Sequence, residues 1–265
     1  MVDLLGDLKP FAGLEWWVLC ALAGTHALGC FIRGAFGFGS NVPIVVISAF
    51  LLPPHHAILL ALMTTLAAQL QLIPAGFRTA DWKVTKPLMG GLVLGTGLGS
   101  WLFSVLSAEW LVIILGGVIV FVILMDTIKV IEKVVRFIDL RSKPLAAALA
   151  SIGGLMGGLS GAGAFYFLVV YLKHACPKPD TLRGTNILLA TLTMGMRFVS
   201  LGFLGFLTPT LILEGLTLWP IAFLATWLGS QAFRRSKPAG FYLSLQIVLL
   251  LGAASLIYKG LSQLT

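Results

Sequence analysis

Two arginines lie within apolar stretches of the chain, where a charged side chain is energetically unfavourable. Arg33 directly precedes a glycine-rich stretch, and Arg197 lies 14 residues beyond Arg183, on one apolar segment. In a helix, that spacing places Arg197 about 21 Å from Arg183. A charge at membrane depth costs at least about 2.5–3.5 kcal/mol and usually has a function and a partner. The nearest candidate partner is Asp126, because the other acidic residues fall at termini, in loops or at segment ends.

An anionic substrate would stabilise two such arginines. A guanidinium group offers fixed, bidentate donors to sulfonate, carboxylate or phosphate oxygens. The alternative is that Arg33 extends to the membrane interface and Arg197 donates to carbonyl oxygens of an unwound helix. We expect the anion-binding arrangement.

Glycine-rich sequences at 34–43 and 157–164 share one pattern at an offset of 124 residues, which pairs Gly34, Gly37 and Gly39 with Gly158, Gly161 and Gly163. Such glycine density, with Pro43 closing the first stretch, interrupts a regular helix. Within a bilayer, a broken backbone is tolerated only inside protein or beside a watery cavity. Paired broken helices in two halves indicate a transporter site, although glycines also serve simply to pack helices closely.

Polar residues near these stretches complete the predicted cavity: Ser40, Asn41, Thr64, Thr65, Gln69, Ser160, Thr185 and Asn186. Single hydroxyls on membrane helices often bond to their own backbone instead. His26, inside the first apolar segment, is a candidate proton relay because an unperturbed imidazole titrates near pH 6.5. The alternative is an ordinary hydrogen-bonded histidine of the bundle.

The composition indicates an integral membrane protein. Hydrophobic residues make up 58% of the chain, charged residues only 11%, and the mean hydropathy is +0.99. A soluble domain has about 25% charged residues. The net charge of +8 comes from bases in short loops between apolar segments, which is a topology signal and not a nucleic-acid surface. The expected partners are the lipid bilayer and a small anion; nucleic acid is excluded, and a homo-oligomer is left open.

Ten apolar segments are expected, at about 14–34, 42–52, 56–77, 86–107, 110–128, 145–160, 164–173, 182–206, 211–233 and 239–258. The segments 42–52 and 164–173 are too short to cross a core of about 30 Å as regular helices. Each follows a glycine-rich stretch, so each stretch and its flanks form a broken hairpin.

The basic residues predict the orientation. If alternate segments reverse direction, 14 of the 18 bases fall on one side, which is then cytoplasmic, with both termini outside. Each half crosses an odd number of times, so two similar halves must be inverted. A further match at an offset of 130 pairs residues 96–103 with 226–233. We therefore predict an all-α protein with one repeat at 1–128, a cytoplasmic amphipathic linker at 129–143 and a second repeat at 144–265.

No catalytic or metal centre is expected. Cys20 and Cys30 are about 15 Å apart on one helix, too far for a disulfide, and Cys176 lies alone in a loop. Histidine spacing suits no metal ion, and we expect no cofactor. The sequence Gly158-Leu159-Ser160-Gly161 matches a short intramembrane serine-protease motif, but no later helix supplies a histidine base. We predict that the protein is not an enzyme.

Residues 77–83 (Phe-Arg-Thr-Ala-Asp-Trp-Lys), the sequence Arg183-Gly184-Thr185-Asn186 and the paired glycine stretches resemble the sulfite exporter TauE/SafE family over nearly the whole chain. The resemblance implies a bacterial inner-membrane transporter with inverted repeats that exports sulfite, sulfoacetate or related organosulfonates. It also implies substrate contacts at Gly37, Gly39, Ser40, Asn41, Gly161, Gly163 and Ala164. The family tends toward consecutive glycines where this chain has Ser40, Asn41 and Ala164, which leaves the substrate open.

The complete set of predicted substrate-binding residues is Arg33, Gly37, Gly39, Ser40, Asn41, Ser160, Gly161, Gly163, Ala164, Asn186 and Arg197. The expected mechanism is alternating access, in which one half rocks against the other around a midplane anion. An anion channel and a carrier of small carboxylates are the alternatives.

Overall fold

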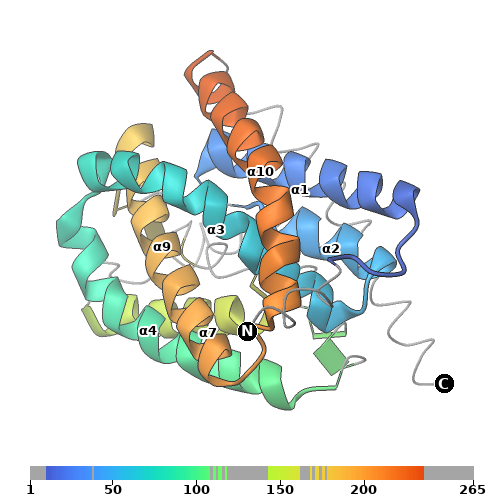
Figure 1. Cartoon of the computed structure of the whole chain (residues 1–265). Coiled ribbons are helices and arrows are strands. Elements are labelled where there is room, and N and C mark those ends of the chain that lie inside the picture. Colours follow the sequence, from blue (N-terminus) through green and yellow to red (C-terminus); the bar gives the residue numbers. More distant parts are fainter. Residues whose placement is uncertain are drawn as a thin grey trace, which may run out of the picture.

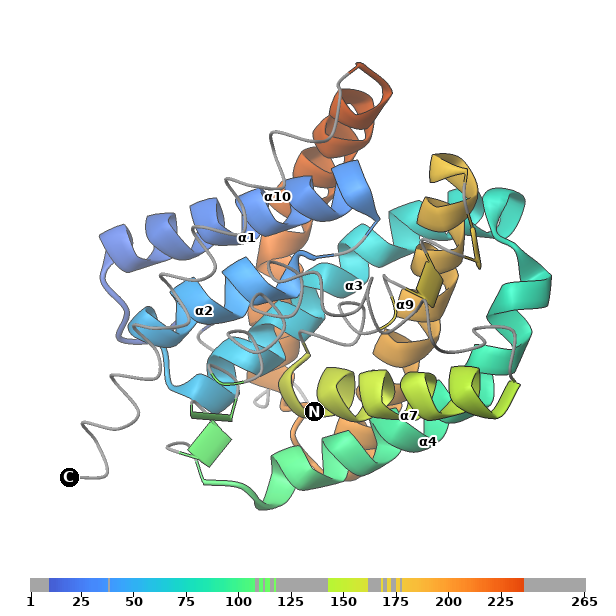
Figure 2. The same ribbon diagram turned by 180° about the vertical axis from the view of Figure 1, so that it is seen from behind.

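The computed structural model describes residues 10–37, 39–107, 143–161 and 178–235, with a few separate positions between these ranges. Within them every regular element is a helix (Figures 1 and 2). The helices are α1 (Trp16–Phe36), α2 (Asn41–Leu51), α3 (Pro54–Thr79), α4 (Trp82–Val105), α7 (Lys143–Ser160), α9 (Pro179–Phe203) and α10 (Pro209–Arg235). Five of these are long and apolar enough to cross a membrane, namely α1, α3, α4, α9 and α10.

The described helices begin and end within a few residues of the expected segments. As predicted, α2 is too short to span, because its 11 residues cover only about 16 Å. The predicted segment at 239–258, and most of 110–128 and of 164–173, lie outside the described residues. The architecture of ten segments in two repeats therefore stays a prediction.

Glycines set two close helix contacts. In both views α7 runs beside α4, and α1 lies against α10 (Figures 1 and 2). A Cβ at any of four glycines would overlap a backbone carbonyl oxygen of the facing helix: Gly34 at Thr226, Gly229 at Phe31, Gly158 at Thr96 and Gly99 at Leu155. Gly34 and Gly158 thus serve the close packing that was the alternative interpretation of the glycine stretches.

The bundle has two ends, which we name by one residue each. At the Phe103 end, residues 10–15, 51–56, 103–107 and 204–209 come together, partly through the apolar cluster around Phe103. At the Asp81 end, residues 78–86 meet 178–185, where the Asp81 backbone N–H donates to Thr185 Oγ1 at 3.0 Å. The described parts of the Phe103 end contain no lysine or arginine, whereas the Asp81 end carries Arg78, Lys83, Lys86, Lys178 and Arg183.

Candidate anion site at the two helix breaks

The first break lies where it was predicted. Helix α1 ends at Phe36, and the N–H of Gly37 donates to the carbonyl of Arg33 at 2.7 Å. Gly37 (φ 80°) and Gly39 (φ 88°) both adopt the left-handed region, which a side chain would strain. The chain then turns directly into α2, so these two glycines change its direction.

The second break begins equally near its predicted place. Helix α7 ends at Ser160, and Gly161 has a φ of 67° with its N–H donating to the Gly157 carbonyl at 2.8 Å. Gly163 and Ala164 lie outside the described residues, and so does the side chain of Ser160. The described part therefore establishes where this helix ends.

The two breaks touch each other. The side-chain amide of Asn41 donates to the carbonyl of Gly161, which is 120 positions away in sequence. Ser40 Oγ lies 3.1 Å from Asn41 Oδ1. Residues predicted from separate glycine stretches are thus brought to one place.

Arg33 lies on one side of this meeting point with only 4% of its surface exposed, so its extension to the interface is wrong. Its Nε donates to Ser40 Oγ at 2.7 Å, and its Nη1 donates to Gln69 Oε1 and approaches Met194 Sδ at 3.4 Å. All three partners are neutral. Within the described ranges, no carboxylate neutralises this guanidinium.

The side-chain amide of Gln69 is itself held in position by hydrogen bonds, so its oxygen stays directed at Arg33. Its amide nitrogen donates to the carbonyl of Ile187 at 2.8 Å and to Thr191 Oγ1 at 2.7 Å. The amide therefore joins α3 to α9 while its oxygen faces Arg33. This predicted residue is a positioning group for the arginine.

Arg197 lies on the other side and is only 2% exposed. Its Nε donates to the carbonyl of Gly158 at 3.0 Å, as the alternative interpretation expected for a single donor. Nη1 and Nη2, however, have no acceptor in the described part of the chain. Nη1 is so close to Gly161 that a Cβ there would overlap it, and the Phe103 ring centroid lies 5.6 Å from the guanidinium carbon.

A buried cation with unused donors is costly unless something negative meets it. Here the two free amino groups of Arg197 lie beside the second break, and Arg33 lies beside the first. The Asn41–Gly161 contact connects the two. This arrangement can bind a small anion between guanidinium groups and backbone of the interrupted helices.

Other predicted residues behave differently. Thr64 and Thr65 donate to the carbonyls of Leu60 (3.0 Å) and Ala61 (2.6 Å), so they satisfy their own helix. Thr185 accepts the Asp81 N–H at the Asp81 end. The side chains of His26 and Asn186 are buried without a hydrogen-bond partner among the described residues, and their roles stay predictions.

The described cysteines are free, as the sequence indicated. Cys176 is buried, and its Sγ lies 3.7 Å from Thr185 Oγ1. Burial raises the pKa of the Cys176 thiol, and the contact with Thr185 only partly opposes this. The thiol therefore stays protonated near neutral pH, which disfavours a reactive role.

Sequence reasoning missed two residues near the site. Arg183 was counted only as a base of the cytoplasmic side, but from α9 its Nη2 donates to the Gly34 carbonyl at 2.7 Å. Helix α9 thus supplies one arginine to each break, Arg183 at Gly34 and Arg197 at Gly158. The contact of Phe103 with the Arg197 guanidinium was not predicted either. In an apolar segment, the sequence does not show which phenylalanine packs on a cation.

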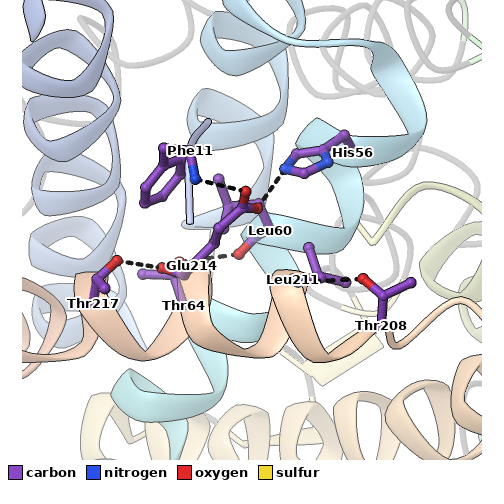
Figure 3. Close-up of polar contacts among 8 residues, drawn as sticks. All are labelled: Phe11, His56, Leu60, Thr64, Thr208, Leu211, Glu214 and Thr217. Atoms are coloured by element: carbon purple, nitrogen blue, oxygen red, sulfur yellow. Dashed lines mark hydrogen bonds and ion pairs between the residues drawn. The ribbon is translucent and has the colours of Figure 1, made fainter. Parts of the chain in front are cut away.

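The sequence did not indicate that one of the acidic residues near a segment end is buried. Glu214 lies in the second turn of α10, near the end of its segment as expected, and its side chain is buried. One carboxylate oxygen lies 2.7 Å from His56 Nε2, and the other accepts the Phe11 N–H at 3.0 Å (Figure 3). Its position inside the apolar run 211–233 was the signal that could have revealed it.

Comparison with models of known protein families identifies the family of the chain. The family model for the sulfite exporter TauE/SafE family matches residues 21–256, a range that contains both breaks and both buried arginines. Neither the curated proteins nor the solved structures contain a match to this chain.

Proposed function

The chain belongs to the sulfite exporter TauE/SafE family, and from this premise we propose that it carries sulfite or a related small organosulfonate across the membrane by alternating access. The family and the apolar helices make it a multi-pass membrane transport protein. The substrate, the mechanism and the site residues are the parts we propose.

One observation carries the proposal: the guanidinium of Arg197 is buried with two unused amino groups beside a helix break. Sulfite and sulfonates present two or more oxygens at the spacing of this fork. Arg33, Ser40 and Asn41 face the same meeting point from the first break. Gly37, Gly39, Gly161, Gly163, Ala164, Ser160 and Asn186 complete the proposed lining.

We further propose two inverted repeats, at 1–128 and 144–265, joined by the linker 129–143. The glycine contacts support this. Under the offset of 124, Gly34 and Phe31 correspond to Gly158 and Leu155, and under the offset of 130, Thr226 and Gly229 correspond to Thr96 and Gly99. The contact of Gly34 with Thr226 therefore corresponds to that of Gly158 with Thr96. Likewise, the contact of Gly229 with Phe31 corresponds to that of Gly99 with Leu155. Equivalent residues thus make equivalent contacts across the two repeats.

The proposed location is the bacterial inner membrane, with the Asp81 end in the cytoplasm and the Phe103 end outside. The basic residues gathered at the Asp81 end support this orientation. It places both termini on the outer side.

Reconstituted counterflow tests the proposal. Proteoliposomes loaded with unlabelled sulfite are expected to accumulate external radiolabelled sulfite, which a carrier does and an open channel does not. Arg197→Met should reduce this uptake at least tenfold, because it removes the free donors. Arg78→Met is the matched control, since Arg78 is an exposed base at the Asp81 end. Unchanged uptake by Arg197→Met would refute the site, and single-channel currents without counterflow would favour a pore.

A further inference from the structure

A buried carboxylate and a half-exposed imidazole form a pair at the Phe103 end. Glu214 of α10 contacts His56 of α3 at 2.7 Å and accepts the backbone N–H of Phe11 at 3.0 Å (Figure 3). The His56 side chain is 35% exposed, so its ring is accessible from the surface of the bundle. One acidic group therefore links the segment before α1, the first turn of α3 and the second turn of α10.

Few other charges act on this pair. The segment before α1 contributes Glu15, which is exposed, and α3 contributes His55. The facing parts of α2, α4 and the 204–208 connection contain no titratable side chain. Among the described residues of the Phe103 end, Glu15 and His55 are thus the titratable groups other than the pair itself.

The Glu214–His56 pair lies close to Phe103, the residue that packs over Arg197 in the proposed anion site. His55, adjacent to His56, places its ring 5.0 Å from the ring of Phe103. Phe103 is fully buried, packs on Phe206 at 5.5 Å and lies over the guanidinium of Arg197. The Glu214–His56 contact fixes the first turn of α3, and that turn holds the His55 ring against Phe103.

We propose that Glu214 and His56 form a proton-binding latch, which holds the Phe103 end closed over Arg197 when His56 is protonated. This inference rests on the proposed transport function. A proton on His56 makes this 2.7 Å contact an ion pair between imidazolium and carboxylate, and loss of the proton removes the charge attraction. The latch therefore predicts faster opening of the Phe103 end at pH 7.5 than at pH 5.5.

Two substitutions test the latch in opposite directions, with sulfite counterflow measured at equal pH on both sides of the membrane. Glu214→Gln removes the carboxylate charge, so its uptake relative to wild type should rise about fivefold to tenfold at pH 5.5 and stay near one at pH 7.5. His56→Arg keeps a permanent cation, so its uptake relative to wild type should stay near one at pH 5.5 and fall to about one fifth or less at pH 7.5.

Ratios at one pH cancel the change in sulfite ionisation between the two conditions. Glu15→Gln, at an exposed acid of the same end, is the control and should give a ratio near one at both pH values. Ratios independent of pH for Glu214→Gln and His56→Arg would overturn the latch, and so would complete loss of counterflow in both. Absence of counterflow in the wild-type protein would instead overturn the transport function itself.

Discussion

Replacing Arg197 with methionine should weaken sulfite binding without lowering the stability of the unliganded protein. The arginine makes one hydrogen bond, to Gly158, and one cation–π contact, to Phe103. Together these are worth about 2–5 kcal/mol. Burying an ion costs several kcal/mol, and Nη1 and Nη2 recover none of this from the described residues. The unliganded variant should therefore unfold at the wild-type temperature or above it.

The effect on binding has the opposite sign. Two lost charge-assisted hydrogen bonds of about 1.5 kcal/mol each raise the Kd for sulfite roughly 150-fold. At a sulfite concentration of about 100 times the wild-type Kd, the wild-type protein gains about 2.7 kcal/mol of stability, whereas the variant gains less than about 0.5 kcal/mol. Unfolding of nanodisc-embedded protein, followed by intrinsic fluorescence with and without sulfite, measures both effects.

Arg33→Met is the matched comparison, because Arg33 is equally buried but its Nε and Nη1 donate to the oxygens of Ser40 and Gln69. Without Arg33, the buried side-chain oxygens of Ser40 and Gln69 lose their hydrogen-bond donor. The free energy of unfolding of the unliganded variant should therefore fall by about 1–3 kcal/mol. If the empty Arg197→Met protein were destabilised as much as Arg33→Met, or if sulfite still protected it fully, Arg197 would be a structural residue.

Further predictions concern the breaks, the packing and a thiol. Asn41→Ala should keep the fold but lower the maximal rate of sulfite counterflow severalfold, since the contact between the two breaks is lost; an unchanged rate would contradict a role for that contact. Gly99→Ala places a Cβ on a backbone carbonyl and should destabilise the protein by about 1–3 kcal/mol, whereas Gly90→Ala, in open space on the same helix, should stabilise it by up to about 1 kcal/mol, both read from thermal unfolding. Because burial raises its thiol pKa, Cys176 should react with N-ethylmaleimide much more slowly at pH 7.5 than free cysteine in solution, and faster as the pH rises; a rate equal to that of free cysteine would contradict its burial.

Much of the scaffold could be predicted, because its causes are local. Long apolar runs set the spanning helices, and the glycines at 37 and 161 adopt the left-handed conformation that ends a helix. The shared spacing of the two glycine stretches indicated two equivalent breaks. The buried state of Arg33 and Arg197 followed from their places inside apolar segments.

The partners of these groups could not be predicted, since they depend on which helix faces which. Thr64 and Gln69 lie on the same helix, yet the first bonds to its own backbone and the second joins Arg33 to α9. The contact of Glu214 with His56 joins residues 158 positions apart. Neither spacing nor composition selects such pairs from the other polar groups of the chain.

The glycine-to-carbonyl contacts also restrict how this protein can move. With no side chain between the backbones, α1 and α10 have little freedom to slide, and the same holds for α4 and α7. Each of these tightly joined pairs takes one helix from each proposed repeat. The repeats are therefore interlocked, and the rigid bodies of a transport cycle would be mixed pairs that cut across the order of the sequence.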